Sequence, residues 1–492
     1  MAVSSMVGVW ARMARERPDA PAVTFGDAPS VSWGVLQRRT NQLARLFAER
    51  GVREGDFVTI ALPNGIDAVE ALLATLKLGA IPNPISHQLP RIEREQLVVL
   101  AEPRLVVATT EDGAAGRPVL IGGPDLTGYA EDDLPEVVSP SWKAPTSGGS
   151  TGRPKIILAG QPAVIDDGED NPLRRAGFPV DGCCLFAGPM YHNTAVLGIL
   201  ASLSLRNHVV LEERFDPELT LRLIDRHRVR FTIMVPTMLS RMWRLPEEVR
   251  ARHDLSSLDK LVHNAAPCPP EVKRAWLDWI GPDRLIENYT ATEQSAMTLC
   301  DGHEWLARPG TVGRVVSGEM EVRGPDGEKC PPGVIGTIWM RRPAGTPPAF
   351  TYVGQDSPAD EDGWETVGDL GHFDADGYLF LADRRQDLII SGGANIYPAE
   401  VELALMAHPS VLEAVVLGLT DSDLGQRTHA LVRLDPERAD EVDADALDEF
   451  ARTRLVRYKC PRSYEFVDTP LRDDAGKVRR SRLAAERQGQ VP

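Results

Sequence analysis

The sequence predicts an α/β fold with a large N-terminal domain of βα sheets plus a small β-barrel, followed by a small α+β C-terminal domain. Three observations lead to this prediction. Strand and helix patterns alternate in the first third, short strands and turns fill about 310–383, and a third pattern begins near Asp387. A chain of 492 residues is also too long for one compact core, so more than one domain is expected.

The N-terminal third alternates between helical and extended patterns. One face of a predicted helix, which ends at Gly51, carries the apolar residues Leu36, Leu43, Leu46 and Phe47. A strand over 57–61, a helix over 69–76 and a strand near Ile81 follow. Strand–helix–strand order with short connections predicts a parallel sheet.

The middle of the chain repeats this pattern and then changes. Strands are predicted over 229–235 and 260–263, and a helix over 271–279 after two prolines. The short strands of 310–383 include a hairpin signal at 374–377, Asp-Ala-Asp-Gly, which favours a small β-barrel.

The C-terminal domain is predicted to begin after a polar boundary, DRRQD at 383–387. We therefore expect domains over 1–384 and 385–492, with a hinge near Gln386. The predicted elements are strands over 388–390, 411–417 and 430–434, helices over 398–408 and 445–454, and a loop over 391–395.

Composition excludes several classes of function. The net charge is −17 and no basic stretch is present, which argues against a nucleic-acid partner. No run approaches the ~20 apolar residues that a membrane span needs, and the N-terminus lacks a signal-peptide pattern. The six cysteines form no Cys-x-x-Cys pair, so zinc and disulfides are not expected, and we expect a cytoplasmic protein.

The segment 146–155, TSGGSTGRPK, is typical of a loop that wraps phosphate oxygens. Glycines let backbone N–H groups approach an anion, hydroxyls add donors, and a lysine adds positive charge. The order of residues differs from the Walker phosphate-binding pattern. Taken alone, the segment is also compatible with a flexible surface loop. The candidate phosphate-binding residues are Ser147, Gly149, Ser150, Thr151, Gly152 and Lys155.

Four more motifs follow in order: ENYTATE at 287–293, TVGDLG at 366–371, SGGANIYP at 391–398 and PLRDDAGKV at 470–478. With these motifs the chain resembles the adenylate-forming superfamily of acyl-CoA ligases, nonribosomal-peptide adenylation domains and luciferases. Its motifs look most like those of the bile-acid–CoA ligase and coronafacate ligase branch. The resemblance implies ATP-dependent activation of a carboxylic acid, with Mg²⁺, and a mobile C-terminal domain.

The resemblance assigns roles to individual residues. It implies that Tyr289 stacks on adenine, Thr292 donates to the α-phosphate and Glu293 holds magnesium. A flat ring, a hydroxyl donor and a hard oxygen ligand suit those tasks. The remaining implied ATP or AMP contacts are Ala265, Ala266, Asn288, the ribose-binding Asp369 and Arg384, and Lys477, which reaches the active site for adenylation.

The sequence departs from the family pattern at a few positions. Gly148 and Ile156 replace a hydroxyl residue and a glycine around the phosphate loop, and Thr290 replaces a glycine that borders the acyl pocket. Gln386 stands where the family hinge usually has Asp or Lys. We expect the hinge to work nevertheless, because it needs backbone freedom more than a particular charge.

The acyl pocket is expected around GPMYHNT at 188–194, with the candidate substrate contacts Tyr191, His192, Asn193, Ala266, Thr290 and Ala291. Amino-acid-activating relatives have an aspartate where this chain has His192, so a free α-amino acid is disfavoured. His192 is either a wall of the pocket or a polar catalytic residue. The resemblance also places Gly392 and Gly393 beside the acceptor channel, although glycines there also suit a simple strand-to-helix loop.

The predicted activity is formation of an acyl-AMP from a bulky cyclic or aromatic acid, then transfer of the acyl group to coenzyme A. One alternative is a stand-alone amide synthetase that transfers the acyl group to an amine or amino acid. Another is a catalytically silent nucleotide-binding protein. The acidic segment 166–170 is expected to be a solvated loop, and Cys183 and Cys184 to be core residues.

Overall fold

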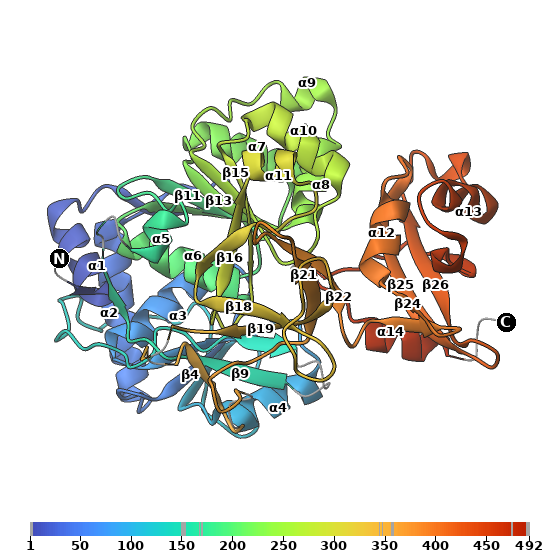
Figure 1. Ribbon diagram of the computed structural model, residues 1–492. Helices are drawn as coiled ribbons and strands as arrows, with labels where there is room; N and C mark the ends of the chain where they lie inside the picture. Colours follow the sequence, from blue (N-terminus) through green and yellow to red (C-terminus); the bar gives the residue numbers. More distant parts are fainter. Residues whose placement is uncertain are drawn as a thin grey trace.

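The computed structural model describes residues 3–148, 154–166, 168, 171–343, 345–346, 348–355, 359–473 and 476–488. A large N-terminal part, mostly blue to yellow in Figure 1, carries a smaller C-terminal part, drawn in deeper orange and red, at one side. Among the described residues, none of the helices combines the length and the apolar character that a bilayer crossing requires.

The largest sheet has nine strands in the order β17-β16-β15-β14-β13-β11-β12-β2-β3. The pairs from β2 to β15 are parallel, and the pairs at both edges are antiparallel. The strands are β2 (Pro21–Phe25), β3 (Val31–Ser32), β11 (Cys183–Phe186), β12 (His208–Leu211), β13 (Phe231–Met234), β14 (Lys260–His263), β15 (Leu285–Thr290), β16 (Met297–Asp301) and β17 (Arg314–Ser317).

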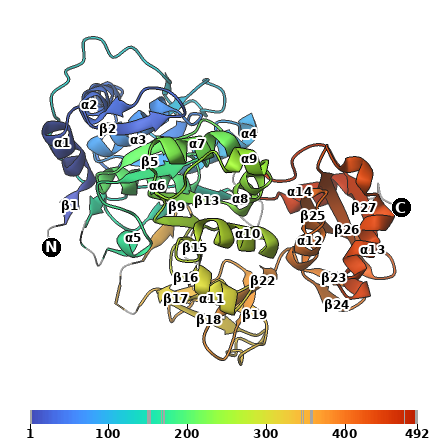
Figure 2. The same cartoon turned by 90° about the horizontal axis from the view of Figure 1, so that it is seen from above.

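A second sheet, β5-β4-β6-β7, is parallel throughout, as the alternating pattern predicts. Helices of the N-terminal part lie beside the two sheets in both views (Figures 1 and 2). These elements are β4 (Phe57–Ala61), β5 (Ile81–Pro84), β6 (Leu105–Ala108), β7 (Val119–Ile121), α1 (Met6–Glu16), α2 (Trp33–Glu49), α3 (Ile66–Lys77), α4 (Arg91–Ala101), α5 (Pro172–Arg175), α6 (Asn193–Ser204), α7 (Pro217–Arg226), α8 (Pro236–Trp243), α9 (Glu247–Arg250), α10 (Pro270–Ile280) and α11 (Gly302–Ala307).

Helix α6 is apolar on nearly every side and almost wholly buried. A helix without a polar face must lie inside the protein, and this helix contacts α1, β11, β12 and β13. Its first residue follows His192, so the segment predicted to open the acyl pocket is anchored to the interior. Cys183 and Cys184, in the neighbouring strand β11, are buried and free, as expected.

Most of the region 310–383 forms a four-stranded antiparallel sheet in the order β18-β19-β21-β22, while β17 and β20 of the same region pair in other sheets. Its described pairings run as an open path and do not themselves close a barrel. The predicted hairpin is present, because the Asp374 side chain accepts hydrogen bonds from the N–H groups of Asp376 and Tyr378 at the turn. The strands are β18 (Glu319–Arg323), β19 (Gly336–Arg341), β21 (Asp369–Phe373) and β22 (Leu379–Arg384).

A small sheet, β20-β9-β8, joins distant parts of the chain. Strand β20 (Phe350–Tyr352) pairs antiparallel with β9 (Pro154–Ala159), which also pairs with β8 (Thr146–Gly148). The predicted phosphate loop therefore connects two paired strands. At the N-terminus β1 (Ser4–Ser5) pairs with β10 (Val164–Ile165).

The C-terminal part is a five-stranded sheet with helices, in agreement with the predicted α+β domain. The predicted loop over 391–395 is wrong: Gly392 and Gly393 make the turn of a hairpin. Both have positive φ, 56° and 81°, which glycine adopts without strain. The elements are β23 (Ile389–Ser391), β24 (Ala394–Ile396), α12 (Pro398–Met406), β25 (Val411–Asp421), β26 (Gly425–Leu434), α13 (Ala444–Arg452), β27 (Ser463–Phe466) and α14 (Arg480–Arg487).

Strands β25 and β26 are longer than the sequence pattern predicts. Their backbone pairing continues to Asp421 and Gly425, beyond Leu419, the last buried apolar residue of β25. Hydropathy marks only the buried half of a strand, so the exposed ends are missed.

Candidate active site

The phosphate-binding candidate lies between two paired strands. Ser147 pairs with Lys155 across the β8–β9 ladder, so the two described ends of the predicted segment lie side by side in one sheet. The candidates Gly149, Ser150, Thr151 and Gly152 lie outside the described residues. Lys155 is described, and its Nζ lies 4.9 Å from the centre of the Tyr352 ring. The residue that Lys155 contacts, Tyr352, lies outside the sequence motifs.

Tyr352 also contacts the predicted metal ligand. Its hydroxyl donates a hydrogen bond to Oε1 of Glu293, with 2.6 Å between the oxygens. Burial and the Glu293 carboxylate both raise the pKa of Tyr352, so the hydroxyl keeps its proton and remains a donor. Two candidate ATP contacts from segments far apart in the chain thus meet at one tyrosine.

The nucleotide candidates Tyr289, Asp369 and Arg384 form one connected group. The Tyr289 hydroxyl donates to Oδ2 of Asp369 at 2.7 Å, and Arg384 donates from Nε to Oδ1 at 3.2 Å. Burial, followed by the Asp369 charge, holds the pKa of Tyr289 well above its usual range. Asp369 and Arg384 are paired residues of β21 and β22. The arrangement fixes a carboxylate beside a flat ring, as ribose and adenine recognition requires.

The segment expected on the other face of adenine carries backbone strain and unpaired acceptors. Ala265 has φ 72°, in the left-handed region that alanine rarely adopts. The buried side-chain oxygens of Asn264 and Asn288 have no hydrogen-bond partner among the described residues. Buried acceptors without partners are costly, and the amino group of an adenine is a donor that would satisfy one of them.

A buried ion pair supports the start of the ENYTATE motif. The Lys273 ammonium donates to Oε2 of Glu287, at the start of the ENYTATE motif, and both side chains are buried. His263 lies 3.9 Å from the same carboxylate oxygen, and burial lowers the pKa of this histidine well below its usual range. A neutral imidazole beside a lysine–glutamate pair points to a structural role for this cluster.

The turn itself holds the remaining candidates of that motif. The N–H of Gln294 donates to the Ala291 carbonyl oxygen at 3.0 Å, which closes a tight turn around Thr292 and Glu293. Gln294 has φ 58°, so this turn, like Ala265, stores strain. The Thr290 hydroxyl donates to the Ala296 carbonyl oxygen at 2.9 Å and is thereby held within the protein.

Lys477 reaches this group from the C-terminal part. An added Cβ at the preceding Gly476 would lie 3.7 Å from Val235, so the lysine-bearing segment touches the N-terminal part. Lys477 is exposed, yet desolvation by the surrounding protein lowers its pKa. Asp473 and Glu293 act in the opposite direction and Arg384 in the same direction. The structure therefore brings Lys477 within electrostatic reach of both the Glu293 and the Arg384 groups.

The side chain of Asn64 holds the predicted acyl-pocket segment through two hydrogen bonds. This side chain donates to the Gly188 carbonyl oxygen at 3.1 Å and accepts from the N–H of Met190 at 2.7 Å. His192 follows, with its ring 4.5 Å from that of Tyr191 and its buried Nε2 without a described partner. Burial, then the Lys477 charge, lowers the pKa of His192 to about 3. A neutral His192 is suited to hydrogen bonding or packing, not to acid–base exchange near pH 7.

Lys143 is a further residue in contact with this segment that the sequence analysis missed. Its buried ammonium donates to the side-chain oxygen of Asn193 and lies 5.1 Å from the centre of the Trp142 ring. Burial lowers the pKa of Lys143 to about 7. The sequence around Lys143 gives no signal for a buried lysine, because its partner Asn193 is fifty positions away in sequence.

The candidates Gly392 and Gly393 are not brought into this group by any described contact. An added Cβ at Gly392 would meet Leu424, in the same C-terminal part, at 3.3 Å, and one at Gly393 would meet no described atom within 4 Å. The acceptor-channel role therefore remains a prediction for a different arrangement of the two parts.

A magnesium ion bound with ATP fits the donor set. Among the described residues no cluster of three or more His, Cys, Asp or Glu side chains could hold a metal alone. Mg²⁺ is commonly held by one or two carboxylates together with substrate phosphates and water. Glu293 offers one such carboxylate, and Tyr352 occupies only its Oε1. Glu365 is a second carboxylate near Glu293. Burial raises the pKa of Glu365, and the charge of Glu293 adds to that increase. The Glu365 carboxylate accepts a hydrogen bond from Ser295.

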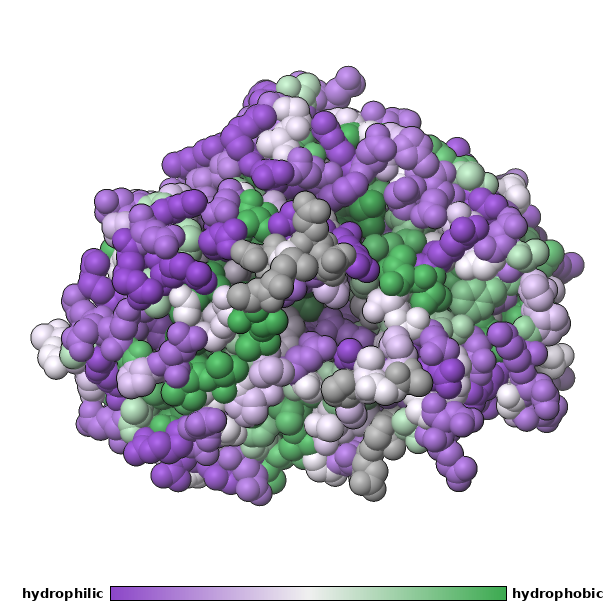
Figure 3. Space-filling model, turned by 60° about the vertical axis from the view of Figure 1, so that its left-hand side comes forward, coloured by the Kyte–Doolittle hydropathy of each residue, from purple (hydrophilic) through white to green (hydrophobic). Residues whose placement is uncertain are grey.

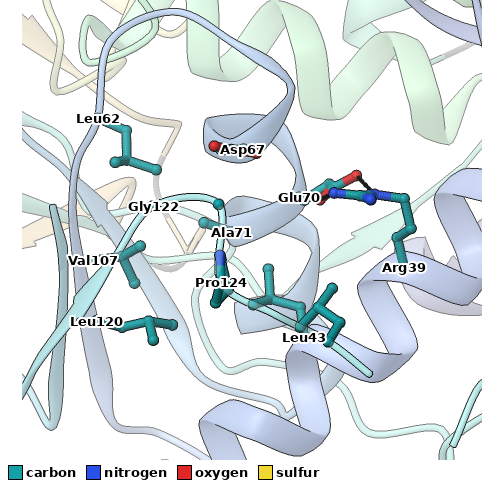
Figure 4. A pocket seen from close by; sticks show the side chains of 12 residues that line it. Arg39, Leu43, Leu62, Asp67, Glu70, Ala71, Val107, Leu120, Gly122 and Pro124 are labelled. Atoms are coloured by element: carbon teal, nitrogen blue, oxygen red, sulfur yellow. Dashed lines mark hydrogen bonds and ion pairs between the residues drawn. The ribbon is translucent and has the colours of Figure 1, made fainter. Parts of the chain in front are cut away.

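A pocket beside the Arg39–Glu70 ion pair is too small to be the acyl site (Figure 4). Its volume of about 10 Å³ is room for about one water molecule. It lies between α2, α3 and the β6–β7 edge, where Leu43, Leu62 and Leu120 line it. The face drawn in Figure 3 has a hollow near its middle, bordered by both hydrophilic and hydrophobic residues.

Comparisons with known proteins agree with this geometry. The AMP-binding enzyme family model matches residues 10–347, and the AMP-binding enzyme C-terminal domain model matches 400–477. A feruloyl-CoA synthase from Amycolatopsis sp. is 33% identical, over 96% of this chain and 97% of its own length. A 2-succinylbenzoate–CoA ligase from Bacillus licheniformis is 29% identical, over 95% and 97%.

Two solved structures are similar over almost the whole chain. The o-succinylbenzoate CoA synthetase (MenE) from Bacillus subtilis, in complex with ATP and magnesium ion, has a TM-score of 0.81 and 26% identity, over 98% of this chain and 100% of that one. The amide bond synthetase McbA from Marinactinospora thermotolerans has a TM-score of 0.80 and 25% identity, over 98% and 100%. The chain belongs to the AMP-binding enzyme family, within the adenylate-forming superfamily. It is an AMP-forming acid ligase.

Proposed function

We propose that this ligase forms an acyl-AMP from a bulky cyclic or aromatic carboxylic acid and transfers the acyl group to coenzyme A. The observation that supports the proposal is that Lys477, in the C-terminal part, lies close enough for Glu293 and Arg384 to influence its pKa and for its own charge to lower the pKa of His192. A cation near both the candidate nucleotide group and the candidate acyl-pocket segment is suited to bring a carboxylate to an α-phosphate.

In the first half-reaction the substrate carboxylate oxygen attacks the α-phosphorus of ATP, and the bond from that phosphorus to the bridging oxygen of pyrophosphate breaks. Lys477 aligns the carboxylate and stabilises the charge on the α-phosphate, while Thr292 donates a hydrogen bond there. Lys155 offsets the charge of the outer phosphates. Glu293 would hold a magnesium ion, which neutralises phosphate charge when bound.

In the second half-reaction the thiolate of coenzyme A attacks the acyl carbonyl carbon, and AMP leaves with the bridging oxygen. The mixed anhydride is already activated, so a thiolate needs no strong base. We propose that the C-terminal part first rotates about Gln386, which removes Lys477 and presents Gly392 and Gly393 to the acceptor.

The aromatic-acid assignment is supported by the acyl-pocket segment. Tyr191 and a neutral His192 offer flat surfaces and one ring nitrogen that has no partner among the described residues, which suit a ring-bearing acid with a polar substituent. The similarity to a feruloyl-CoA synthase and to 2-succinylbenzoate–CoA ligases points in the same direction. One relative of similar identity is named for a small acid: the sulfoacetate–CoA ligase from Cupriavidus necator, which is 30% identical.

Transfer to an amine is the second candidate. The similarity to an amide bond synthetase at a TM-score of 0.80 favours it, and so does Lys143, a buried lysine beside the acyl-pocket segment. An amine acceptor must lose a proton, and an amine with a pKa of about 7 is suited to accept one.

The test is mass spectrometry of the products from ATP, Mg²⁺ and a panel of aromatic and polycyclic acids, with coenzyme A, with amines, and without either. A thioester that requires coenzyme A supports the proposal, and an amide that forms without it supports the alternative. ATP–pyrophosphate exchange that stays flat with every acid would instead indicate a silent nucleotide-binding protein.

A further inference from the structure

We propose that Tyr352 is a positioning residue of the ATP site, which holds Lys155 with its ring and Glu293 with its hydroxyl so that both are ready for Mg·ATP. The inference rests on the proposed ATP-dependent function and adds to it a residue outside the sequence motifs.

The sheet register explains how Tyr352 reaches both groups. Tyr352 lies opposite Ile157 in the β20–β9 pair, and Lys155 is two positions before Ile157. Residues two positions apart lie on the same face of a strand, so Tyr352 and Lys155 are diagonal neighbours within reach of long side chains. Glu293 arrives from the turn after β15. The three residues come from three separate segments, and Tyr352 is the one that touches both others.

The charges of Lys155 and Glu293 explain why a link between them is useful. A direct ion pair would use the ammonium and the carboxylate on each other and leave less charge for phosphate and metal. In the described part of the chain, Lys155 has no ion pair, and its ammonium instead faces the Tyr352 ring at 4.9 Å. The ring attracts a cation without neutralising it.

The hydroxyl has a matching effect on Glu293. Its hydrogen bond fixes Oε1 at 2.6 Å and orients the carboxylate, while no described residue hydrogen-bonds the second oxygen. Because a tyrosine hydroxyl donates one hydrogen, it occupies one oxygen and leaves the other for a metal ion. Tyr352 thus orients the carboxylate and keeps the ammonium apart from it.

The experiment is calorimetric titration of the full-length protein with ATP, in excess Mg²⁺ and in EDTA, without any acid. Tyr352→Phe removes only the hydrogen bond, and we expect about a tenfold rise in the Kd for ATP with Mg²⁺ and less than about twofold in EDTA. Tyr352→Leu also removes the ring, and we expect about a threefold rise in EDTA as well.

Tyr129→Phe is the matched control, because Tyr129 donates to Glu49 across the same 2.6 Å at an exposed site in the N-terminal part. It should bind ATP as the wild type does. A Tyr352→Phe variant that binds Mg·ATP within about twofold of the wild type would overturn the proposal.

A double-mutant cycle separates positioning from a general loss of structure. In a Glu293→Gln background, Tyr352→Phe should add less than about twofold to the Kd for ATP with Mg²⁺, because the hydroxyl acts through that carboxylate. Additive effects would contradict the inference. The titration needs no acid, so its outcome is distinct from failure of the proposed function, which appears as an absence of acyl product in the wild type.

Discussion

The carboxylate of Asp383 accepts a hydrogen bond from the backbone N–H of Ala399, with 2.8 Å between oxygen and nitrogen. Asp383 belongs to β22, before the predicted hinge at Gln386, and Ala399 belongs to the first turn of α12, after it. The N–H groups of a first helical turn have no partner within the helix, so an acceptor there stabilises the helix. This bond ties the two sides of the hinge together in the arrangement that brings Lys477 to the site.

Asp383→Ala should therefore shift the protein away from the adenylation arrangement. Loss of such a cap costs about 1 kcal/mol, which corresponds to about a fivefold decrease in ATP–pyrophosphate exchange if the bond forms only in this arrangement. Acyl transfer from a synthetic acyl-AMP should be unchanged or faster. Both rates are measured on the same preparation.

The control for that variant is Asp443→Ala. Asp443 caps α13 through the N–H of Ala446 at 2.9 Å, wholly within the C-terminal part. It should reduce stability without changing the ratio of the two rates. If Asp383→Ala lowers both half-reactions equally, the bond has no role in the domain arrangement.

Lys477→Ala should separate the two half-reactions more strongly. The lysine is the cation that approaches the nucleotide group from the C-terminal part, so its loss should reduce ATP–pyrophosphate exchange by about 100-fold or more. Transfer from synthetic acyl-AMP should stay within about twofold of the wild-type rate, because the proposed rotation removes Lys477 from the site.

Lys459→Ala provides the comparison, since Lys459 is in the same C-terminal part and pairs with Glu400 at 2.7 Å away from the described site group. It should leave both rates near wild type. Loss of both half-reactions in Lys477→Ala would contradict the rotation about Gln386.

Ala265→Gly tests whether strain is stored at the nucleotide segment. Alanine with φ 72° is in a region that glycine adopts freely, so the substitution should raise the free energy of unfolding by about 0.5–1 kcal/mol. The measurement is the urea midpoint at constant m-value. A decrease in stability would mean that the alanine methyl group contributes more through packing than the backbone loses through strain.

The sequence was most informative where periodicity or an ordered motif carries the signal. Strand β14 has the predicted bounds, Lys260–His263, because all but one of its residues are buried on both faces of a parallel sheet. The motif residues Tyr289 and Asp369 lie in different sheets, and a hydrogen bond joins them. Their roles toward ATP remain predictions, but their proximity is a property of the structure.

The remaining features depend on contacts that a linear pattern does not contain. Tyr352 is placed by the register of β20 against β9, two segments about two hundred positions apart. The hairpin turn at Gly392 and Gly393 was predicted as a loop, because two three-residue strands are too short to show alternation. Tertiary pairing decides such short elements.

Lys143 gives a prediction of pH dependence with a defined sign. Burial lowers its pKa in the folded protein to about 7, from an ordinary value of 10.5 in the unfolded chain. The folded state therefore favours the neutral amine. Burial of Lys143 therefore costs the folded state nothing above pH 10.5, where the amine is neutral in both states. This penalty grows as the pH falls, because the unfolded chain binds the proton first, and it is complete once the pH passes below about 7.

Lys143→Met should remove this penalty, because a methionine of similar length fills the same space without a charge. We expect the free energy of unfolding at pH 7 to rise by on the order of 2–4 kcal/mol, and the difference from wild type to shrink toward pH 10. Urea unfolding at both pH values, followed by tryptophan fluorescence, measures the difference. Lys459→Met, a change at an ion-paired lysine elsewhere, should show no such pH trend. A Lys143→Met protein that is less stable than wild type at pH 7 would mean that the bond to Asn193 outweighs the cost of burying the charge.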